Sequence, residues 1–395
     1  MFKKYDKMKK EIFIIVLIFL FFNRFFGAVD IPNTITVTLL FVCFIYGSSI
    51  PSAFSSAFRM IFGGLLISSV SCWMMRGQSL IDTFQALNFY WGILFYFFLL
   101  RKNYSSESIE KSILTLTLVF DVLYIAQFHL LDYGYNFLNI QDWMNDNELE
   151  GARLRVMSSG LYSIGIFYGI VTYFDNGSTR WFKTLLIMLG IYVMFLAGYR
   201  QLLLSLALTF VFYIWRIHYK PQLKHIVPVI LAVCVFYFIY QLPEVQQKLG
   251  GMAERQEVAT LDNEDYVRVL QLDYYLHHYF LTPLEYITGS GLPYYKSAFG
   301  KYMENQLKWV DWGLLGQSWV LGILTICGWL AFSIKAIRLR VEHRFKYISL
   351  WYVYLLSASL TNGEFFRDGN FLVHALVLYL AEKITYDQPK KAKVL

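Results

Sequence analysis

Long apolar stretches separated by short polar connections dominate the chain. A helix that crosses a bilayer needs about 20 mostly apolar residues, and twelve windows of the sequence come close to that length. These windows cover residues 11–27, 32–49, 57–75, 80–100, 112–131, 157–174, 183–198, 201–217, 223–241, 313–334, 347–362 and 366–383. The pattern predicts an all-α polytopic membrane protein with about 12 transmembrane helices.

The composition agrees with this pattern. Hydrophobic residues make up 57% of the 395 residues and charged residues only 16%, whereas a soluble domain has about 45–50% and about 25%. A soluble fold of this size lacks the interior to hide so many apolar side chains. We therefore expect the solvent of most helices to be a bilayer.

The basic residues predict how the chain is oriented. Lys and Arg gather in cytoplasmic connections, and every strong cluster falls on one side if the N-terminus is inside. The clusters lie within 3–10, 101–111, 180–183, 216–224, 335–346 and 383–393. Both termini are then cytoplasmic. Arg24 and the lack of a small-x-small cleavage site argue that the first span is an anchor rather than a removed signal peptide.

This orientation divides the chain into five segments. Helices 1–5 occupy residues 1–131, helices 6–9 occupy 157–241, and helices 10–12 with a cytoplasmic tail occupy 313–395. Between them lie an outer loop at 132–157 and a long outer loop at 242–312. The long loop is the candidate catalytic segment, because loops of this length in a compact protein are usually functional.

The long outer loop carries two local patterns. Apolar residues recur at helical spacing from Tyr266 to Leu281, which predicts an amphipathic helix against the outer face of the membrane. Pro283 ends it. The sequence Gly289-Ser290-Gly291 then predicts a tight turn, which is compatible both with a place near the site and with an ordinary surface turn.

Several arginines lie on the predicted outer side, where they have no role in orientation. Arg200 sits in a short connection between two apolar windows, Arg268 lies near the start of the predicted amphipathic helix, and Arg153 and Arg155 lie in the first outer loop. The arginine fork donates paired hydrogen bonds to phosphate oxygens. These residues are candidate ligands of a lipid diphosphate, although Arg200 could also simply snorkel to the interface.

Two residues are candidates for a general base. Asp311 lies among apolar and aromatic residues at the mouth of the tenth window, where a carboxylate can accept a proton or cap the following helix. His278 lies on the predicted amphipathic helix, where it is either a base or part of the polar face. No glycine-rich phosphate loop and no Asp-x-Asp or histidine cluster occurs, so we expect no nucleotide cofactor and no metal. The four cysteines are expected to be free, buried thiols.

The order of these motifs resembles the O-antigen polymerase and ligase superfamily, which comprises Wzy-type polysaccharide polymerases and lipopolysaccharide ligases. The most specific stretches are Gly198-Tyr199-Arg200, Arg268, Pro283, Gly289-Ser290-Gly291 and Asp311-Trp312-Gly313-Leu314-Leu315-Gly316. The ligase relatives usually have a histidine where this chain has Asp311, and that difference favours a polymerase.

The resemblance implies a fold similar to the GT-C class and a metal-independent integral-membrane glycosyltransferase of the bacterial inner membrane. Its donor and acceptor would be glycans on undecaprenyl diphosphate, joined into O-antigen, capsule or exopolysaccharide at the outer face. Membrane lipid and a chain-length regulator and flippase of the same pathway are the expected partners, and nucleic acid is not. The alternatives are an O-antigen ligase acting on lipid A core and a transporter or flippase of lipid-linked oligosaccharide.

Overall fold

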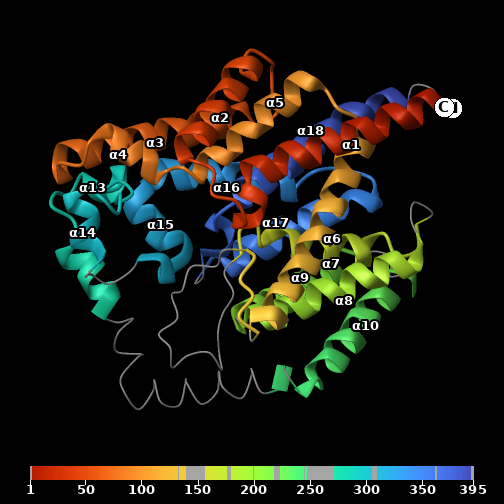
Figure 1. Ribbon diagram of the computed structural model, residues 1–395. Coiled ribbons are helices and arrows are strands. Elements are labelled where there is room, and N and C mark those ends of the chain that lie inside the picture. Colours follow the sequence, from red (N-terminus) through yellow and green to blue (C-terminus); the bar gives the residue numbers. More distant parts are fainter. Residues whose placement is uncertain are drawn as a thin grey trace.

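The computed structural model describes most of the chain as helices. It covers residues 2–131, 133–138, 156–175, 179–198, 200–217, 223–243, 245–246, 270–304, 309–360 and 363–392. These residues form α-helices with short 3-10 and π-helical turns and contain no β-strand. Figure 1 shows the helices gathered together, with the start of α1 beside the end of α18.

The helices fall into three runs along the chain. The first run comprises α1 (Phe2–Phe22), α2 (Asn33–Gly47), α3 (Ser55–Arg76), α4 (Leu80–Ala86), η2 (Tyr90–Leu94), α5 (Phe95–Lys102) and α6 (Ser106–Leu131), with the turn η1 (Arg24–Gly27) between α1 and α2. The second comprises α7 (Gly160–Val171), α8 (Arg180–Ala197), α9 (Arg200–Ile217) and α10 (Leu223–Tyr240). The third comprises α15 (Gly313–Leu321), α16 (Ile323–Ile337), η6 (His343–Phe345), α17 (Lys346–Ala358), η7 (Gly363–Phe366) and α18 (Asn370–Ala392).

The segment before α15, which the sequence predicts to lie outside, has shorter elements within residues 270–304 and 309–312, and we call it the outer segment. They are η4 (Tyr274–His278), α13 (Glu285–Thr288), α14 (Ala298–Glu304) and η5 (Trp309–Trp312).

Each predicted apolar window contains a helix, and in the described part of the chain three helices are long and apolar enough to cross a membrane unaided. These are α3, α6 and α8. A fourth joins them if α4 and the helical residues 90–102 form one span, although these two parts meet at a bend of 76°. Five further apolar helices have 10–17 residues. The structure therefore indicates a helical membrane protein, while the number of 12 spans remains a prediction.

Small residues let two helix pairs pack closely. A Cβ atom on Gly190 of α8 would lie 2.8 Å from the carbonyl oxygen of Tyr162 in α7. A Cβ on Gly328 of α16 would lie 2.9 Å from the carbonyl oxygen of Ala57 in α3. Such glycine contacts are typical of helices that associate in lipid, where backbones must approach closely to gain packing energy.

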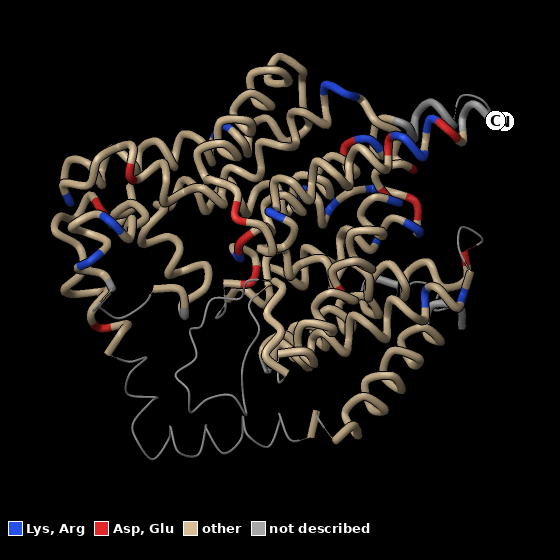
Figure 2. The backbone as a smooth tube through the Cα atoms, in the orientation of Figure 1, with Lys and Arg blue, Asp and Glu red and all other residues tan. Residues whose placement is uncertain are grey.

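Charged residues lie mainly on connections and helix ends (Figure 2). At one end of the helices, Lys335 of α16 donates a hydrogen bond to the carbonyl oxygen of Ala53, and the N–H of Ala53 donates to Glu382 Oε1 of α18 at 2.9 Å. The next residue, Lys383, donates to Asn103 Oδ1 at 2.8 Å. These contacts bring basic clusters that are far apart in the sequence to the same end of the protein, as expected for the cytoplasmic side.

The orientation can be tested with single cysteines in a variant whose four native cysteines are replaced by alanine. Tyr133→Cys and Lys301→Cys should react with a membrane-impermeant thiol reagent in whole cells with a permeabilised outer barrier. Both positions are exposed and lie on the predicted outer side. Lys102→Cys and Glu342→Cys are also exposed but should react only after the inner membrane is broken. The reverse labelling pattern would invert the orientation.

The cysteines are free, but the prediction that all four are buried is wrong. Cys72 is buried and Cys43 is partly buried, whereas Cys234 and Cys327 are exposed. The last two lie on the apolar helices α10 and α16, whose outward faces carry apolar residues. In a membrane protein an apolar side chain on an outward face contacts lipid, so an apolar sequence context does not distinguish lipid contact from burial in the protein.

Candidate functional site

A buried ion pair holds the outer segment on the end of α3. Nε of Arg76 lies 2.9 Å from Oε1 of Glu285, and Nη2 lies 2.9 Å from Oε2. Nη2 also donates to the carbonyl oxygen of Tyr279 at 2.6 Å, and the N–H of Leu281 donates to Glu285 Oε2 at 2.6 Å. The exposed fractions of the two charged side chains are only 7% and 0%. Buried charges need such additional hydrogen bonds to offset desolvation.

An aromatic cluster extends this anchor to α15. The ring of Tyr275 stacks on Trp319 with centroids 4.5 Å apart and an angle of 9° between the ring planes. Tyr279 is buried, and its hydroxyl lies 2.5 Å from Ser290 Oγ. Burial raises the pKa of Tyr279, so its hydroxyl stays protonated and available for this hydrogen bond.

The Gly289-Ser290-Gly291 motif is buried, so its interpretation as a surface turn is wrong. Ser290 is fully buried, and the N–H groups of Ser290 and Gly291 donate to the carbonyl oxygens of Trp319 and Val320 at 2.9 Å. Gly291 has φ of +79°, and a Cβ there would collide with Cys72 of α3. The motif is glycine-rich because the chain passes between α3 and α15 with no room for side chains.

The Arg76–Glu285 pair is expected to contribute to the stability of the outer segment. Arg76→Leu should destabilise the anchored segment by about 3–5 kcal/mol, because Glu285 is left buried without its partner. Faster cleavage of the outer segment by protease and a lower melting temperature of the purified protein would report this. The double change Arg76→Leu with Glu285→Leu should recover most of the loss.

A matched control is available on the surface. Lys111 and Glu107 also form an ion pair at 2.9 Å, but their side chains are 44% and 53% exposed. Lys111→Leu should therefore change stability by less than about 1 kcal/mol. Equal effects of Arg76→Leu and Lys111→Leu would contradict the anchoring role.

The predicted amphipathic helix lies partly within the described residues. Leu270 to His278 are helical, with the last turn widened to a π-helix. His278 does not point into the protein: its side chain is 65% exposed, and Nε2 lies 3.8 Å from Asp273 Oδ2. Asp273 also pairs with His277 at 2.9 Å. The helix thus buries tyrosines on one face and presents the two histidines to solvent on the other.

The structure explains the glycines that follow Asp311. The backbone of Asp311 lies in η5, and its side chain lies outside the described residues. A Cβ on Gly313 would collide with the carbonyl oxygen of Ser359, and a Cβ on Gly316 with that of Trp309. The N–H of Leu314 donates to Ser359 at 2.8 Å. The glycines therefore let α15 lie against η5 on one side and against the end of α17 on the other.

Trp312 occupies the N-cap position of α15, and no side chain there accepts a capping hydrogen bond. Asp311 precedes the cap position by one residue. This placement weighs against helix capping as the reason for an aspartate at position 311.

The other predicted ligands are placed only in part. Arg200 begins α9, two residues after Gly198, which caps the end of α8 with φ of +67°. The side chain of Arg200 lies outside the described residues. Arg268, Arg153 and Arg155 lie outside them altogether. The helix α9 packs along α17. The two helices run in opposite directions, because Tyr213 near the end of α9 lies 3.5 Å from His343, which precedes α17. The start of α9 thus lies toward the end of α17.

A buried acidic residue that the sequence reading missed lies beside η5. Arg367 Nε lies 2.6 Å from Glu364 Oε2, and the exposed fractions of these side chains are 17% and 0%. Ser159 Oγ donates to Glu364 Oε1 at 2.9 Å. The turn η7, which contains Glu364, contacts η5, and Gly363 lies near Val310. The turn that carries Glu364 therefore contacts the turn that carries Asp311.

A polar network fixes this cluster to the start of α7. The N–H of Gly160 donates to Asn370 Oδ1 at 2.9 Å, and Asn370 Nδ2 donates to the carbonyl oxygen of Glu364 at 2.7 Å. The N–H of Ser158 donates to the carbonyl oxygen of Asp368 at 2.7 Å. Sequence patterns could not reveal this network, because its partners are about 200 residues apart in the chain.

No family model, curated protein or solved structure matches this chain. The described geometry by itself offers an acidic and a basic side chain held rigidly beside a segment that carries a further carboxylate. The charges of Glu364 and Arg367 offset each other, so the pair serves to hold the turn in place, and the carboxylate of Asp311 is the group that can accept a proton.

Proposed function

We propose that this protein is an integral-membrane glycosyltransferase that polymerises oligosaccharide repeat units carried on undecaprenyl diphosphate. It would act at the outer face of the bacterial inner membrane with a GT-C-like arrangement of helices. The observation that supports this proposal best is the position of η5. The segment that carries Asp311 lies beside the Glu364–Arg367 pair, at the ends of apolar helices and next to a firmly anchored outer segment.

The chemistry needs a base and a stabilised leaving group. A hydroxyl oxygen of the acceptor sugar attacks the anomeric carbon of the donor, and a new glycosidic C–O bond forms. The bond from that carbon to the lipid diphosphate breaks, and its electron pair stays on the diphosphate. Asp311 takes the proton of the hydroxyl group. Arg200 and Arg268 stabilise the growing negative charge more in the transition state than in the ground state, which is the condition for catalysis.

Exposed aromatic rings in the outer segment fit a sugar substrate. Tyr295 is 62% exposed, and its ring lies 4.9 Å from that of Tyr294. Tyr286 and Tyr302 are also exposed. Aromatic rings with polar edges offer an apolar face and a hydrogen-bonding group together, and a glycan presents the same combination.

Transport is the less favoured function. A transport path across the bilayer needs polar residues inside the spans, and the three that lie well inside the predicted apolar windows are Asp82, Asp121 and His374. Two of these three have local structural roles. The Asp82 carboxylate stabilises the start of α4, where it accepts a hydrogen bond from Ser79 Oγ at 2.8 Å. His374 is fully buried in α18, with the ring of Phe365 4.3 Å away. Asp121, the third, is buried, and its carboxylate oxygens have no hydrogen-bond partner among the described residues.

Deletion of the gene tests the proposal and separates the alternatives. Lipid-linked and surface glycan from the deletion strain would be separated on a gel. We expect single repeat units in place of a ladder of polymer lengths, with restoration of the ladder by the intact gene. Full-length polymer that is not transferred to lipid A core would instead identify a ligase. Repeat units that accumulate on the inner leaflet would identify a flippase.

A further inference from the structure

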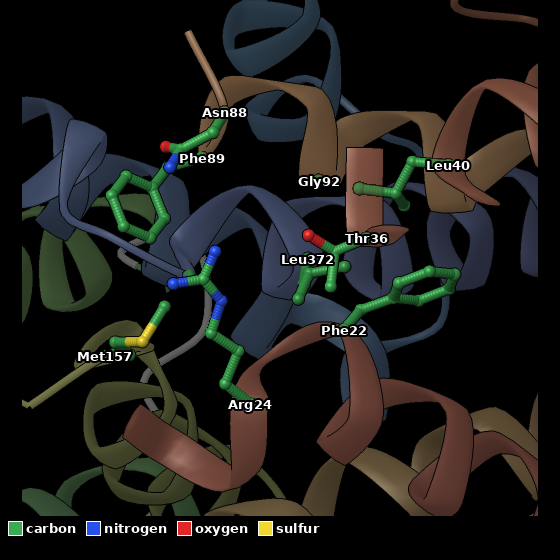
Figure 3. A pocket seen from close by; sticks show the side chains of 10 residues that line it. Phe22, Arg24, Thr36, Leu40, Asn88, Phe89, Gly92, Met157 and Leu372 are labelled. Carbon is green, nitrogen blue, oxygen red and sulfur yellow. The ribbon is translucent and has the colours of Figure 1, made fainter. Parts of the chain in front are cut away.

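Arg24 lies in a pocket on the predicted outer side of the helices, formed where α1, α2 and η2 meet α18. Phe22, Thr36, Asn88, Phe89 and Met157 are among the residues that line it. In Figure 3 the guanidinium group of Arg24 points into this pocket, between Phe89 and Met157 on one side and Leu372 on the other. From the sequence alone, Arg24 serves only to argue that the first span stays attached as an anchor.

The guanidinium group is partly buried, and no carboxylate of the described residues contacts it directly. Among the residues that the structure describes, it forms no ion pair and no hydrogen bond, and its nearest assigned contact is the Phe89 ring, whose centroid lies 5.9 Å from Cζ. Asp30 and Asp368 act on it electrostatically, but neither lies within ion-pair distance. A guanidinium group removed from water without a partner is unfavourable, so this position calls for an anionic ligand.

The backbone is held in a costly conformation that aims Arg24 inward. Arg24, Phe25 and Phe26 have φ of +52°, +50° and +59°, a region that residues with a Cβ avoid. Burial of Phe26, which contacts Phe120 with ring centroids 5.6 Å apart, stabilises the turn. The side chain of the preceding Asn23 donates a hydrogen bond to Ser158. Strained positions of this kind are concentrated at ligand sites.

The pocket matches a phosphate oxygen in size and chemistry. The enclosed space measures about 20 Å³, whereas one water needs about 10–15 Å³, so a single oxygen atom of a larger group fits beside the guanidinium. Asn88 Oδ1 is buried and has no hydrogen-bond partner in the described part of the chain. Because an amide can present either its oxygen or its NH₂ group after a flip, Asn88 can donate to the same phosphate.

An apolar cavity next to this pocket suits a hydrocarbon chain. It measures about 210 Å³ and is lined by Phe41, Phe44, Phe62, Leu65, Leu66, Ser69, Phe84, Trp91 and Leu94. The helix α2 and the turn η2 contribute residues both to this cavity and to the Arg24 pocket. Leu66 is 62% exposed, so the cavity opens onto the outward apolar surface that lipid would cover.

We propose that the Arg24 pocket binds the phosphate group of a polyprenyl phosphate lipid whose chain begins in this apolar cavity. The pocket adjoins the connection from η7 to α18, because Gly369 lines it, but Arg24 and not Arg367 points into it (Figure 3). Only the identity of the natural lipid rests on the proposed function, because polymerisation brings two lipid diphosphates, those of the donor and of the acceptor, to the outer face. Arg24 supplies the charge, and the cavity selects a lipid over a free anion.

Photo-crosslinking tests the site without any need for polymer formation. The full-length protein in phosphatidylcholine nanodiscs is illuminated with farnesyl diphosphate that carries a diazirine at its chain end, and the labelled peptides are identified by mass spectrometry. We expect labels within residues 41–94. Arg24→Gln should reduce labelling about tenfold, as expected for a lost charge-assisted hydrogen bond, and Arg24→Lys should reduce it less. Leu66→Trp, which fills the cavity from its open side, should also reduce it.

Controls keep the result specific. Arg59→Gln removes one exposed charge from α3, a helix that lines the cavity, and should leave labelling unchanged. Elution volume on size-exclusion chromatography identifies any variant that has lost its fold. If Arg24→Gln has lost its fold, the labelling of Arg24→Lys relative to that of the wild-type protein decides whether Arg24 binds the lipid. Unchanged labelling in folded Arg24→Gln would overturn the proposal. Competition by inorganic pyrophosphate as strong as by unlabelled farnesyl diphosphate would show a free-anion site and overturn the lipid assignment.

Discussion

Replacement of Arg200 by alanine is expected to abolish polymer while the protein remains inserted at normal abundance. Arg200 begins α9, and the antiparallel packing of α9 on α17 brings this position toward the side of η7 and η5. Loss of one preorganised donor to a developing anion lowers turnover by about 10²–10³. A loss of this size leaves no visible ladder of polymer on a gel. Arg268→Ala should have the same effect if both arginines hold the leaving diphosphate.

The conservative and control variants separate catalysis from folding. Arg200→Lys should restore only part of the activity, since a point charge cannot reproduce the paired hydrogen bonds of a guanidinium. Arg180 begins α8 and is exposed, so Arg180→Ala should make polymer of normal length. Polymer of full length in Arg200→Ala at equal protein level would make Arg200 a structural residue.

The sequence predicts the helices well because bilayer crossing imposes a length and a composition on each of them. Each apolar window coincides with at least one helix. Two windows are broken rather than straight. The window at 80–100 contains α4 and the residues 90–102 at an angle of 76°, and the window at 313–334 contains α15 and α16, separated by Gly322. Asn88 and Gly92 lie near the bend of the first window, but apolar composition alone does not distinguish a straight span from a broken one.

The candidate site could be predicted only where it is local in the sequence. The glycines after Asp311 and the turn at Gly198 are short motifs, and the structure supplies a steric reason for each. Glu364, by contrast, is a candidate only because Arg367, Ser159 and Asn370 contact it and its backbone. These contacts depend on how α7, η7 and α18 pack. A residue pattern along one helix carries no information about such partners.

Arg24 illustrates the same limit from the opposite direction. An arginine near the end of an apolar window normally snorkels to the interface, and the sequence offers no reason to expect otherwise. The three positive φ values that turn it inward depend on burial of Phe26 and on the contact from Asn23 to Ser158. Tertiary packing therefore overrides the usual preference of the backbone at this position.

Asp311→Asn is expected to lower polymer formation at least 100-fold, within the range of about 10²–10⁴ for loss of a general base. Asparagine keeps the size and the hydrogen-bonding capacity of aspartate and serves equally well as a helix cap, but it cannot accept a proton at neutral pH. The cap position of α15 is occupied by Trp312, so the change should leave the fold intact. Initial rates with lipid-linked repeat units and reconstituted protein would measure the loss.

His278→Gln is the companion variant that decides which residue is the base. His278 is largely exposed and lies beside Asp273, on the face of its helix opposite the buried tyrosines. We therefore expect His278→Gln to retain most of the activity. Normal rates in Asp311→Asn, together with an inactive but inserted His278→Gln, would move the base to the outer helix. In that case the outer segment would have to turn its histidines toward η5 when substrate binds, and the Arg76–Glu285 anchor would oppose that movement.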